Sequence, residues 1–167
     1  MKKLVLVAHD NFDASRINRA LVEAVQSLDN VTVHHIPQPH LIDVTKEQEL
    51  LLAHDEIVFQ FPLQWFSSPA SLKSWFDKVL SYNWAYGENY NLSGKTFRVV
   101  LTTGGVTEAY LPGGQNGITF DEVLKPIEKT VGYIKGVYAQ PFLVNGVYQL
   151  SDEDLKTKAK EFASTLV

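Results

Sequence analysis

Three segments of the chain carry side chains that could bind a ligand. The first, His9–Ser15, leads into Arg16 and Asn18 at the start of a helical pattern. A hydroxyl, a cation and the free backbone N–H groups of a helix start would together suit one phosphate. Ser15 is equally well explained as an ordinary helix N-cap, so this segment by itself leaves both interpretations open.

The second segment, Pro62–Pro69, reads PLQWFSSP and is unusually apolar for a loop. Leu63, Gln64, Trp65 and Phe66 would form an apolar wall, with backbone groups directed at a flat heterocycle. Packing of the two aromatic side chains into the core is the alternative, and the sequence leaves it open.

The third segment, Gly104–Thr119, is long and has no periodic pattern, which is typical of functional loops. It begins at the run Thr102-Thr103-Gly104-Gly105, where the glycines allow a backbone to approach a ligand closely; an ordinary turn is the alternative, and the sequence leaves it open. The three segments together predict a mononucleotide with a large planar ring. Flavin mononucleotide (FMN) fits, with its phosphate at the first segment and its ring between the other two.

Alternating elements position these segments. Apolar, β-branched runs predict five strands at Leu4–Val7, Val31–Ile36, Glu56–Phe61, Thr96–Thr103 and Val137–Val144, the last interrupted by Pro141 and therefore expected at an edge. Helical periodicity covers Ile17–Leu28, Thr45–Ala53, Leu72–Leu80, Phe120–Ile134 and Leu155–Leu166. Within Phe120–Ile134, Pro126 should kink the helix or begin it. The pattern predicts a single doubly wound α/β domain over residues 1–167, with parallel strand order 2-1-3-4-5. All three segments would then meet at the carboxyl edge of the sheet, where such folds bind ligands.

Composition removes several classes of function. The 15 basic and 19 acidic residues give a net charge of -4, and the basic residues are scattered, which argues against nucleic acid as a partner. The chain has no cysteine, so disulfides, thiolate catalysis and iron–sulfur ligation are absent. No signal peptide or membrane span of about 20 apolar residues is present, so we expect a cytoplasmic protein. The spacing of His34, His35, His40 and His54 does not match a metal site.

One long stretch carries a family resemblance. The segment IVFQFPLQWFSSPASLKSWFDKVL, residues 57–80, resembles the hallmark stretch of the NAD(P)H:quinone oxidoreductase (DT-diaphorase) family, whose fold is flavodoxin-like. The resemblance spans roughly residues 3 to 145 and is closest to the short bacterial branch that includes the ancillary subunit of glutathione-gated potassium efflux systems. Further matches are Ala8-His9, Ser15-x-x-Asn18, Trp84-Ala85-Tyr86-Gly87 and Thr102–Gly105.

The resemblance implies a flavin site. FMN is expected rather than FAD, because the chain lacks the extensions of the FAD-binding vertebrate enzymes. The phosphate and ribityl chain would be held by His9, Ser15, Ile17 and Asn18, with Arg16 added from the first segment. The ring would lie against Pro62, Leu63, Gln64, Trp65, Phe66, Thr102, Thr103, Gly104 and Gly105.

The resemblance also implies an activity. Reduced nicotinamide, NADH or NADPH, would give a hydride to flavin N5, and a quinone or similar flat acceptor would then take two electrons by a ping-pong mechanism. Tyr110 matches the family tyrosine beside the flavin, and Asn116 stands where the family has a histidine. Members are homodimers with shared active sites, so Tyr86 and Trp84 would contact substrate in the partner's pocket. Taken without the resemblance, Trp84-Ala85-Tyr86 is equally well explained as an exposed loop patch or as core. The alternative is a regulatory subunit that binds a membrane potassium-efflux protein.

Overall fold

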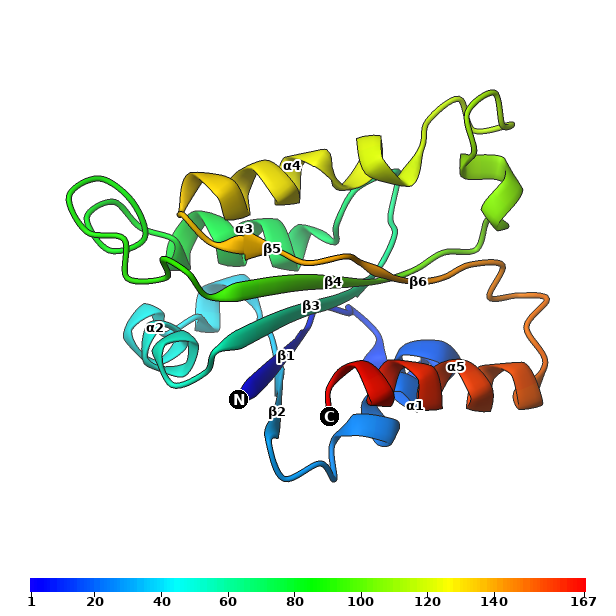
Figure 1. The fold of residues 1–167 in the computed structure, drawn as a ribbon, viewed down its shortest axis with the longest axis horizontal. Coiled ribbons are helices and arrows are strands. Elements are labelled where there is room, and N and C mark those ends of the chain that lie inside the picture. The colour runs from blue at the N-terminus through cyan, green and yellow to red at the C-terminus, as the bar shows by residue number, and fades with distance from the viewer.

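The computed structural model describes residues 1–167 and contains one sheet of six parallel strands. Figure 1 shows the sheet in the middle of the molecule, with helices above and below it. The order β2-β1-β3-β4-β5, with β6 also paired to β4, confirms the predicted order and the flavodoxin-like fold. The strands are β1 (Lys3–Val7), β2 (Val31–His35), β3 (Glu56–Pro62), β4 (Thr96–Thr102), β5 (Val137–Tyr138) and β6 (Phe142–Val144).

The predicted fifth strand, Val137–Val144, is two short strands rather than one. β5 pairs with the first residues of β4, and β6 pairs with its last three. Pro141 lies in the break, where it has no N–H to give to the ladder. The expectation that proline interrupts an edge strand is confirmed, but the expected single strand is corrected to two.

Five α-helices cover the two faces of the sheet. They are α1 (Arg16–Val25), α2 (Val44–Leu52), α3 (Ala70–Val79), α4 (Phe120–Tyr133) and α5 (Asp152–Thr165), with short 3-10 turns at Phe12–Ala14, Pro39–Leu41 and Thr107–Tyr110. Ser15, Asp43, Thr119 and Ser151 each cap a helix by accepting a backbone N–H bond. Thr119 begins α4 through a capping box with Glu122, so Pro126 lies inside the helix and does not begin it.

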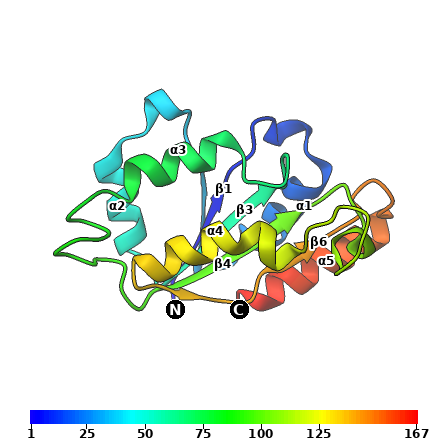
Figure 2. The ribbon, with the colours of Figure 1, turned by 90° about the horizontal axis from the view of Figure 1, so that it is seen from above.

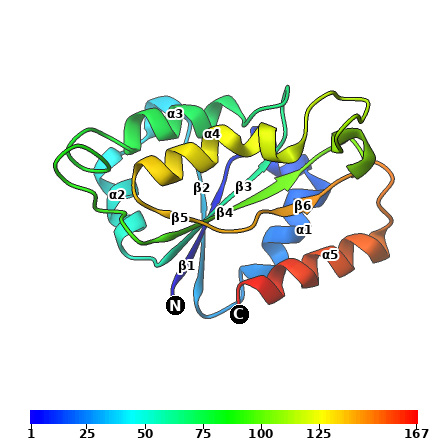
Figure 3. The same ribbon diagram turned by 45° about the horizontal axis from the view of Figure 1, so that its top comes forward.

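Side chains alternate along the strands and feed two separate cores. Leu4 and Leu6 of β1 pack beneath α2, α3 and α4, whereas Val5 and Val7 pack against α1 and α5. Figures 1 and 3 show α3 and α4 on one side of the sheet and α1 and α5 on the other. Burial on both faces explains why the strands read as nearly continuous apolar runs.

A buried polar cluster ties α2 to α3. The carboxylate of Glu47, only 4% exposed, accepts a 2.9 Å bond from Trp75 Nε1 and lies 2.9 Å from Nε2 of His34. Burial raises the pKa of Glu47, but the hydrogen bonds from His34 and Trp75 outweigh it and leave the pKa below its ordinary value. The carboxylate is therefore charged at neutral pH inside the fold.

The histidines outside the carboxyl edge have structural surroundings. His54 bonds to Leu50 O and Thr32 Oγ1, and the ring of His35 packs 4.5 Å from that of Phe12. His34 and His35 point to opposite faces of β2, as their adjacency predicted. Nowhere do three or more acidic, histidine or cysteine side chains gather as ligands of one metal ion. None of the helices combines the length and the apolarity that crossing a membrane requires.

Candidate flavin site

The carboxyl edge of the sheet holds two adjoining cavities. Figure 2 shows the loops that follow β1, β3, β4 and β6 at this edge. The larger cavity, about 550 Å³, is lined by ten of the residues predicted to bind the cofactor: His9, Ser15, Arg16, Ile17, Asn18, Pro62, Leu63, Thr102, Thr103 and Gly104. The smaller, about 220 Å³, is lined by Leu63, Trp65, Phe66, Thr103, Gly104 and Tyr110. The two share Leu63, Thr103 and Gly104, so they form one continuous site.

The larger cavity ends at the first turn of α1. Ser15 Oγ accepts the N–H of Asn18 at 3.2 Å, which confirms the N-cap interpretation, and Ser15 lines the cavity as well. The first N–H groups of a helix have no carbonyl partner within the helix, so those of Arg16 and Ile17 are available to an anion. The capping and phosphate interpretations of Ser15 are therefore compatible.

Asn18 is fixed on the floor of the larger cavity. Its side chain is 2% exposed, and Nδ2 donates to Thr102 Oγ1 at 3.0 Å. Gln60, fully buried beneath it, donates to the Asn18 carbonyl at 2.9 Å, while Gln60 Oε1 has no partner. The sequence marked Gln60 only as the polar exception in an apolar strand. The structure shows that it supports Asn18.

His9 is held as a neutral imidazole. Its Nδ1 accepts the N–H of Asn11 at 3.1 Å. Burial lowers the pKa of His9, and the nearby Asp10 carboxylate opposes that shift without cancelling it. The lowered pKa favours the neutral ring in the free chain, and with Nδ1 accepting from Asn11 its other nitrogen, Nε2, is the one left to bond a ligand.

The loop after β3 presents strained, exposed aromatic residues. Trp65 and Phe66 have φ angles of +45° and +58°, and their side chains are 95% and 44% exposed. Left-handed backbone at two bulky residues in succession costs free energy, and such strain concentrates at ligand sites. Core packing is thus wrong for Trp65. Leu63 N–H donates to Thr102 O at 2.8 Å, which joins this loop to the end of β4.

Two tyrosines stand against the Gly104-Gly105 backbone. A Cβ at Gly104 would lie 2.7 Å from Cε2 of Tyr148, and one at Gly105 would lie 2.9 Å from Cε2 of Tyr110. Tyr110 is 7% exposed and stacks on Phe120, with ring centroids 4.2 Å apart. Burial raises the pKa of the Tyr110 phenol, so it stays protonated and able to donate at neutral pH.

The sequence did not predict the side of the larger cavity that lies next to the loop between β6 and α5. Val147 and Tyr148 line it from the loop between β6 and α5. This loop follows the fifth predicted strand, and its proximity could have been inferred from topology. No motif marked it.

Five predicted residues lie outside the two cavities. Gln64 and Gly105 adjoin lining residues in the chain, whereas Asn116 is half-buried in the loop after Tyr110 and donates its backbone N–H to Ala109 O at 3.1 Å. Trp84 and Tyr86 lie farther away, packed against the core under α3 and α4. Trp84 and Tyr86 therefore do not line the two cavities of their own chain.

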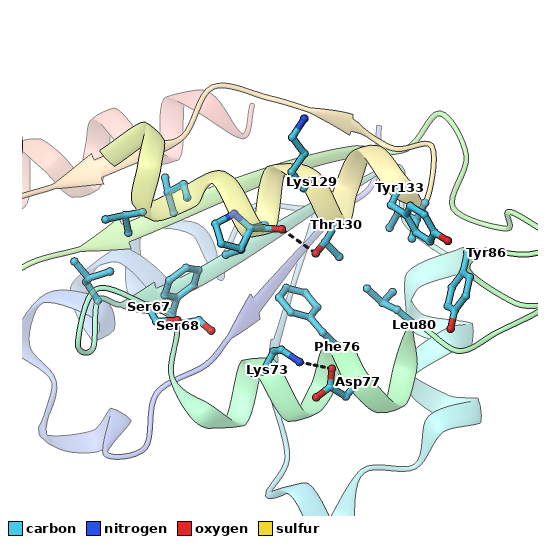
Figure 4. Close-up of a pocket in the computed structure, with 17 residues that line it drawn as sticks. Ser67, Ser68, Lys73, Phe76, Asp77, Leu80, Tyr86, Lys129, Thr130 and Tyr133 are labelled. Carbon is cyan, nitrogen blue, oxygen red and sulfur yellow. Dashed lines mark hydrogen bonds and ion pairs between the residues drawn. The ribbon is translucent and has the colours of Figure 1, made fainter. Parts of the chain in front are cut away.

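Tyr86 lines a different concavity, a groove of about 600 Å³ between α3 and α4. Figure 4 shows Phe76 of α3 and Leu80, the residue that caps the C-terminus of α3, facing Thr130 of α4, with Tyr86 and Tyr133 at one end. Leu63 also lines this groove, so the groove adjoins the two cavities.

The donor set fits a flavin mononucleotide. The larger cavity has a helix N-terminus for a phosphate and Asn18 and Thr102 for a polyol chain. The smaller offers apolar side chains and the backbone of Gly104, which has no Cβ, for a flat ring. Their combined size falls in the range of about 300–1,000 Å³ typical of small-molecule sites.

Comparison with known proteins assigns the chain to a family. A family model described as "Flavodoxin-like fold" matches residues 1–166. The glutathione-regulated potassium-efflux system ancillary protein KefG of Cronobacter sakazakii is 40% identical over 166 residues, covering 96% of this chain and 90% of that one.

Two solved structures are similar over nearly the whole chain. The general stress protein 14 of Treponema denticola, in complex with FMN, has a TM-score of 0.93 and 34% identity, covering 99% of this chain and 98% of that one. An NADPH-quinone reductase from P. pentosaceus has a TM-score of 0.94 and 30% identity, covering 100% and 98%. The chain belongs to the flavodoxin-like NAD(P)H oxidoreductase family.

Proposed function

We propose that the protein is a cytoplasmic, FMN-dependent NAD(P)H oxidoreductase that reduces a quinone or a similar flat acceptor. The observation that carries the proposal is the pair of adjoining cavities, one polar and ending at a helix N-terminus, the other apolar and open. The FMN complex and the quinone reductase among its structural neighbours support the cofactor and the acceptor class. When bound, the flavin would accept a hydride from the reduced nicotinamide and pass two electrons to the acceptor.

The chain's own residues would hold and tune the flavin. The first turn of α1 and His9 would bind the phosphate, and Asn18 would hydrogen-bond the ribityl chain. Trp65 and Phe66 would cover the ring, with Tyr110 protonated beside it to donate to developing negative charge. Asn116 can also donate but cannot become cationic, so its electrostatic contribution would be weaker than that of a histidine.

The proposal includes a homodimer. The groove between α3 and α4 is largely apolar and adjoins the cavities through Leu63. Tyr86 and Tyr133 form an aromatic cluster at its end, with ring centroids 5.6 Å apart. A second copy packed there would cover the groove, and Tyr86 would contribute to the partner's substrate pocket.

Steady-state kinetics test the enzymatic proposal. One pocket that serves donor and acceptor in turn requires a ping-pong scheme, so double-reciprocal plots at several quinone concentrations should be parallel. The assay should be run with NADH and with NADPH. Intersecting lines would contradict the shared pocket, and no turnover with either nicotinamide would contradict the oxidoreductase itself.

A second candidate function is regulatory. The 40% identity to KefG favours a flavin-binding subunit of a potassium-efflux system. In that case the protein would bind the cytoplasmic part of such a channel whether or not it turns over quinones. Co-purification with a potassium-efflux membrane protein from the same organism would support this function, and its absence alongside efficient quinone turnover would favour the enzyme.

A further inference from the structure

The loop between β6 and α5, residues 145–151, lines the larger cavity with Val147 and Tyr148, and its backbone is held by hydrogen bonds. Gly146 N–H donates to Gly105 O at 2.9 Å and Val147 N–H to Thr103 O at 3.1 Å. Thr103 Oγ1 also lies 3.1 Å from Asn145 Oδ1. The first half of the loop is thus bonded to the segment that follows β4, and Tyr148 stands over Gly104 as a consequence.

The second half of the loop is tied to the start of α1. Arg16, the first residue of that helix, donates from Nη2 to Leu150 O at 2.9 Å. Its Nη2 and Nε also bond Asp152 Oδ1 at 2.5 and 3.2 Å. We call this set of contacts the Arg16 clasp. It joins the loop to the end of the cavity where Ser15 and Arg16 lie.

We propose that the Arg16 clasp, together with Tyr148, restricts the cofactor to the mononucleotide form of flavin. This inference rests on the proposed flavin function. In FAD, an AMP group is attached through the flavin's own phosphate, so the AMP must leave the cavity at the phosphate end. Arg16 stands at that end and Tyr148 lines the same cavity, so an AMP group leaving there would have to part the exposed Arg16–Asp152 pair and pass the Tyr148 ring.

The charges around the clasp also oppose the binding of FAD. Asp152, Glu153 and Asp154 form the first turn of α5, next to the clasp. Two nitrogens of Arg16 are already bonded to Asp152, so a second phosphate would face carboxylates whose charge the clasp only partly offsets. The single phosphate of FMN instead stays inside the cavity, at the N–H groups of α1.

Affinity measurements on the apoprotein test this. Fluorescence titration should give FMN at least about 100-fold tighter than FAD for the wild type. Asp152→Ala removes the carboxylate that accepts two of the three bonds of the clasp, without altering a residue that lines the cavity, and Tyr148→Ala removes the ring. In the double variant, FAD should bind at least about tenfold more tightly than it does to the wild type, while riboflavin, which has no phosphate, should change by less than about twofold.

A matched control separates the clasp from general charge removal. Glu161→Gln removes another carboxylate of α5 that is paired on the surface, with Lys158 at 2.7 Å, and should leave the FMN to FAD ratio unchanged. Urea midpoints check that every variant is folded. Equal affinity of the wild type for FMN and FAD, or an unmoved ratio in the double variant, would overturn the inference alone. Failure of the wild type to bind any flavin would overturn the proposed function instead.

Discussion

Two concavities of the molecule are similar in volume but differ in the residues and backbone that line them. The cavity at the carboxyl edge, about 550 Å³, has five hydrophobic residues among its fourteen, whereas the α3–α4 groove, about 600 Å³, has ten among seventeen. The cavity is built from strand ends and a helix start, where backbone N–H groups are free. The groove is built from helix flanks, where they are already bonded. A phosphorylated cofactor suits the first, and a protein surface suits the second.

The largest expected effect comes from placing a charge in the cavity. Asn18→Asp is nearly isosteric and can still accept from Gln60, but it puts a carboxylate where the flavin phosphate and ribityl chain would lie. We expect FMN affinity to fall by at least about 100-fold. Fluorescence titration measures this, with riboflavin as the ligand that should lose less. The exposed Asn89→Asp is the matched control, and an FMN affinity equal to that of the wild type in Asn18→Asp would contradict the phosphate placement.

A substitution in the buried Glu47 cluster, beside the groove wall, should lower the stability of the fold and leave FMN binding nearly unchanged. Glu47→Gln weakens the bonds to His34 and Trp75, and Trp75 is next in sequence to Phe76 of the groove wall. Removing hydrogen bonds to a buried charge should cost roughly 2 kcal/mol of unfolding free energy at pH 7. Urea unfolding measures that loss, while FMN affinity should stay within about twofold of the wild type.

The pH dependence of this effect follows from the lowered pKa of Glu47. The ionised carboxylate adds stability above its unfolded pKa of about 4.3, and this contribution is lost as pH falls through the lower folded pKa. The difference between the wild type and Glu47→Gln should therefore shrink below about pH 4. A difference that is constant from pH 7 to pH 3 would contradict a charged Glu47.

A substitution inside the groove should prevent dimer formation and leave FMN binding intact. Thr130→Arg puts a bulky cation on the half-buried middle of the groove, which would prevent a second copy from packing there. Sedimentation should show a monomer, and quinone turnover should fall at least about tenfold while FMN remains bound. A variant that stays dimeric, or a wild type that is monomeric and fully active, would contradict the role given to the groove.

The smallest effects concern Tyr110, which lines the smaller cavity, and Asn116, which lies in the loop after it and outside both cavities. Tyr110→Phe removes a donor and should slow flavin reduction about tenfold, and Asn116→His should speed it about threefold by adding a group that can become cationic. Stopped-flow absorbance measures both, with Tyr90→Phe as the control. Because burial raises the pKa of Tyr110, its contribution should be constant between about pH 6 and pH 9. Unchanged rates in both variants would show that neither side chain acts on the flavin.

The sequence anticipated the strand order and the meeting of three loops because both follow from local patterns. Buried runs such as Leu4–Val7 predict parallel strands, and parallel strands place their following loops at one edge. The features that the sequence did not predict depend on contacts between residues that are far apart in the chain. The bond between Arg16 and Asp152 joins residues 136 positions apart, and Tyr148 reaches Gly104 through a loop without a motif. The exposure of Trp65 was undecided because periodicity does not distinguish a ligand wall from a core.

Absorbance spectroscopy of the purified protein would show whether it is an FMN-dependent reductase. Absorbance should be recorded before and after anaerobic addition of NADH or NADPH, and the released cofactor should be identified. We expect flavin bands from FMN that bleach when the nicotinamide is added. A colourless protein that takes up no added FMN would contradict the site, and bound FMN that does not bleach would contradict the reductase and favour the regulatory function.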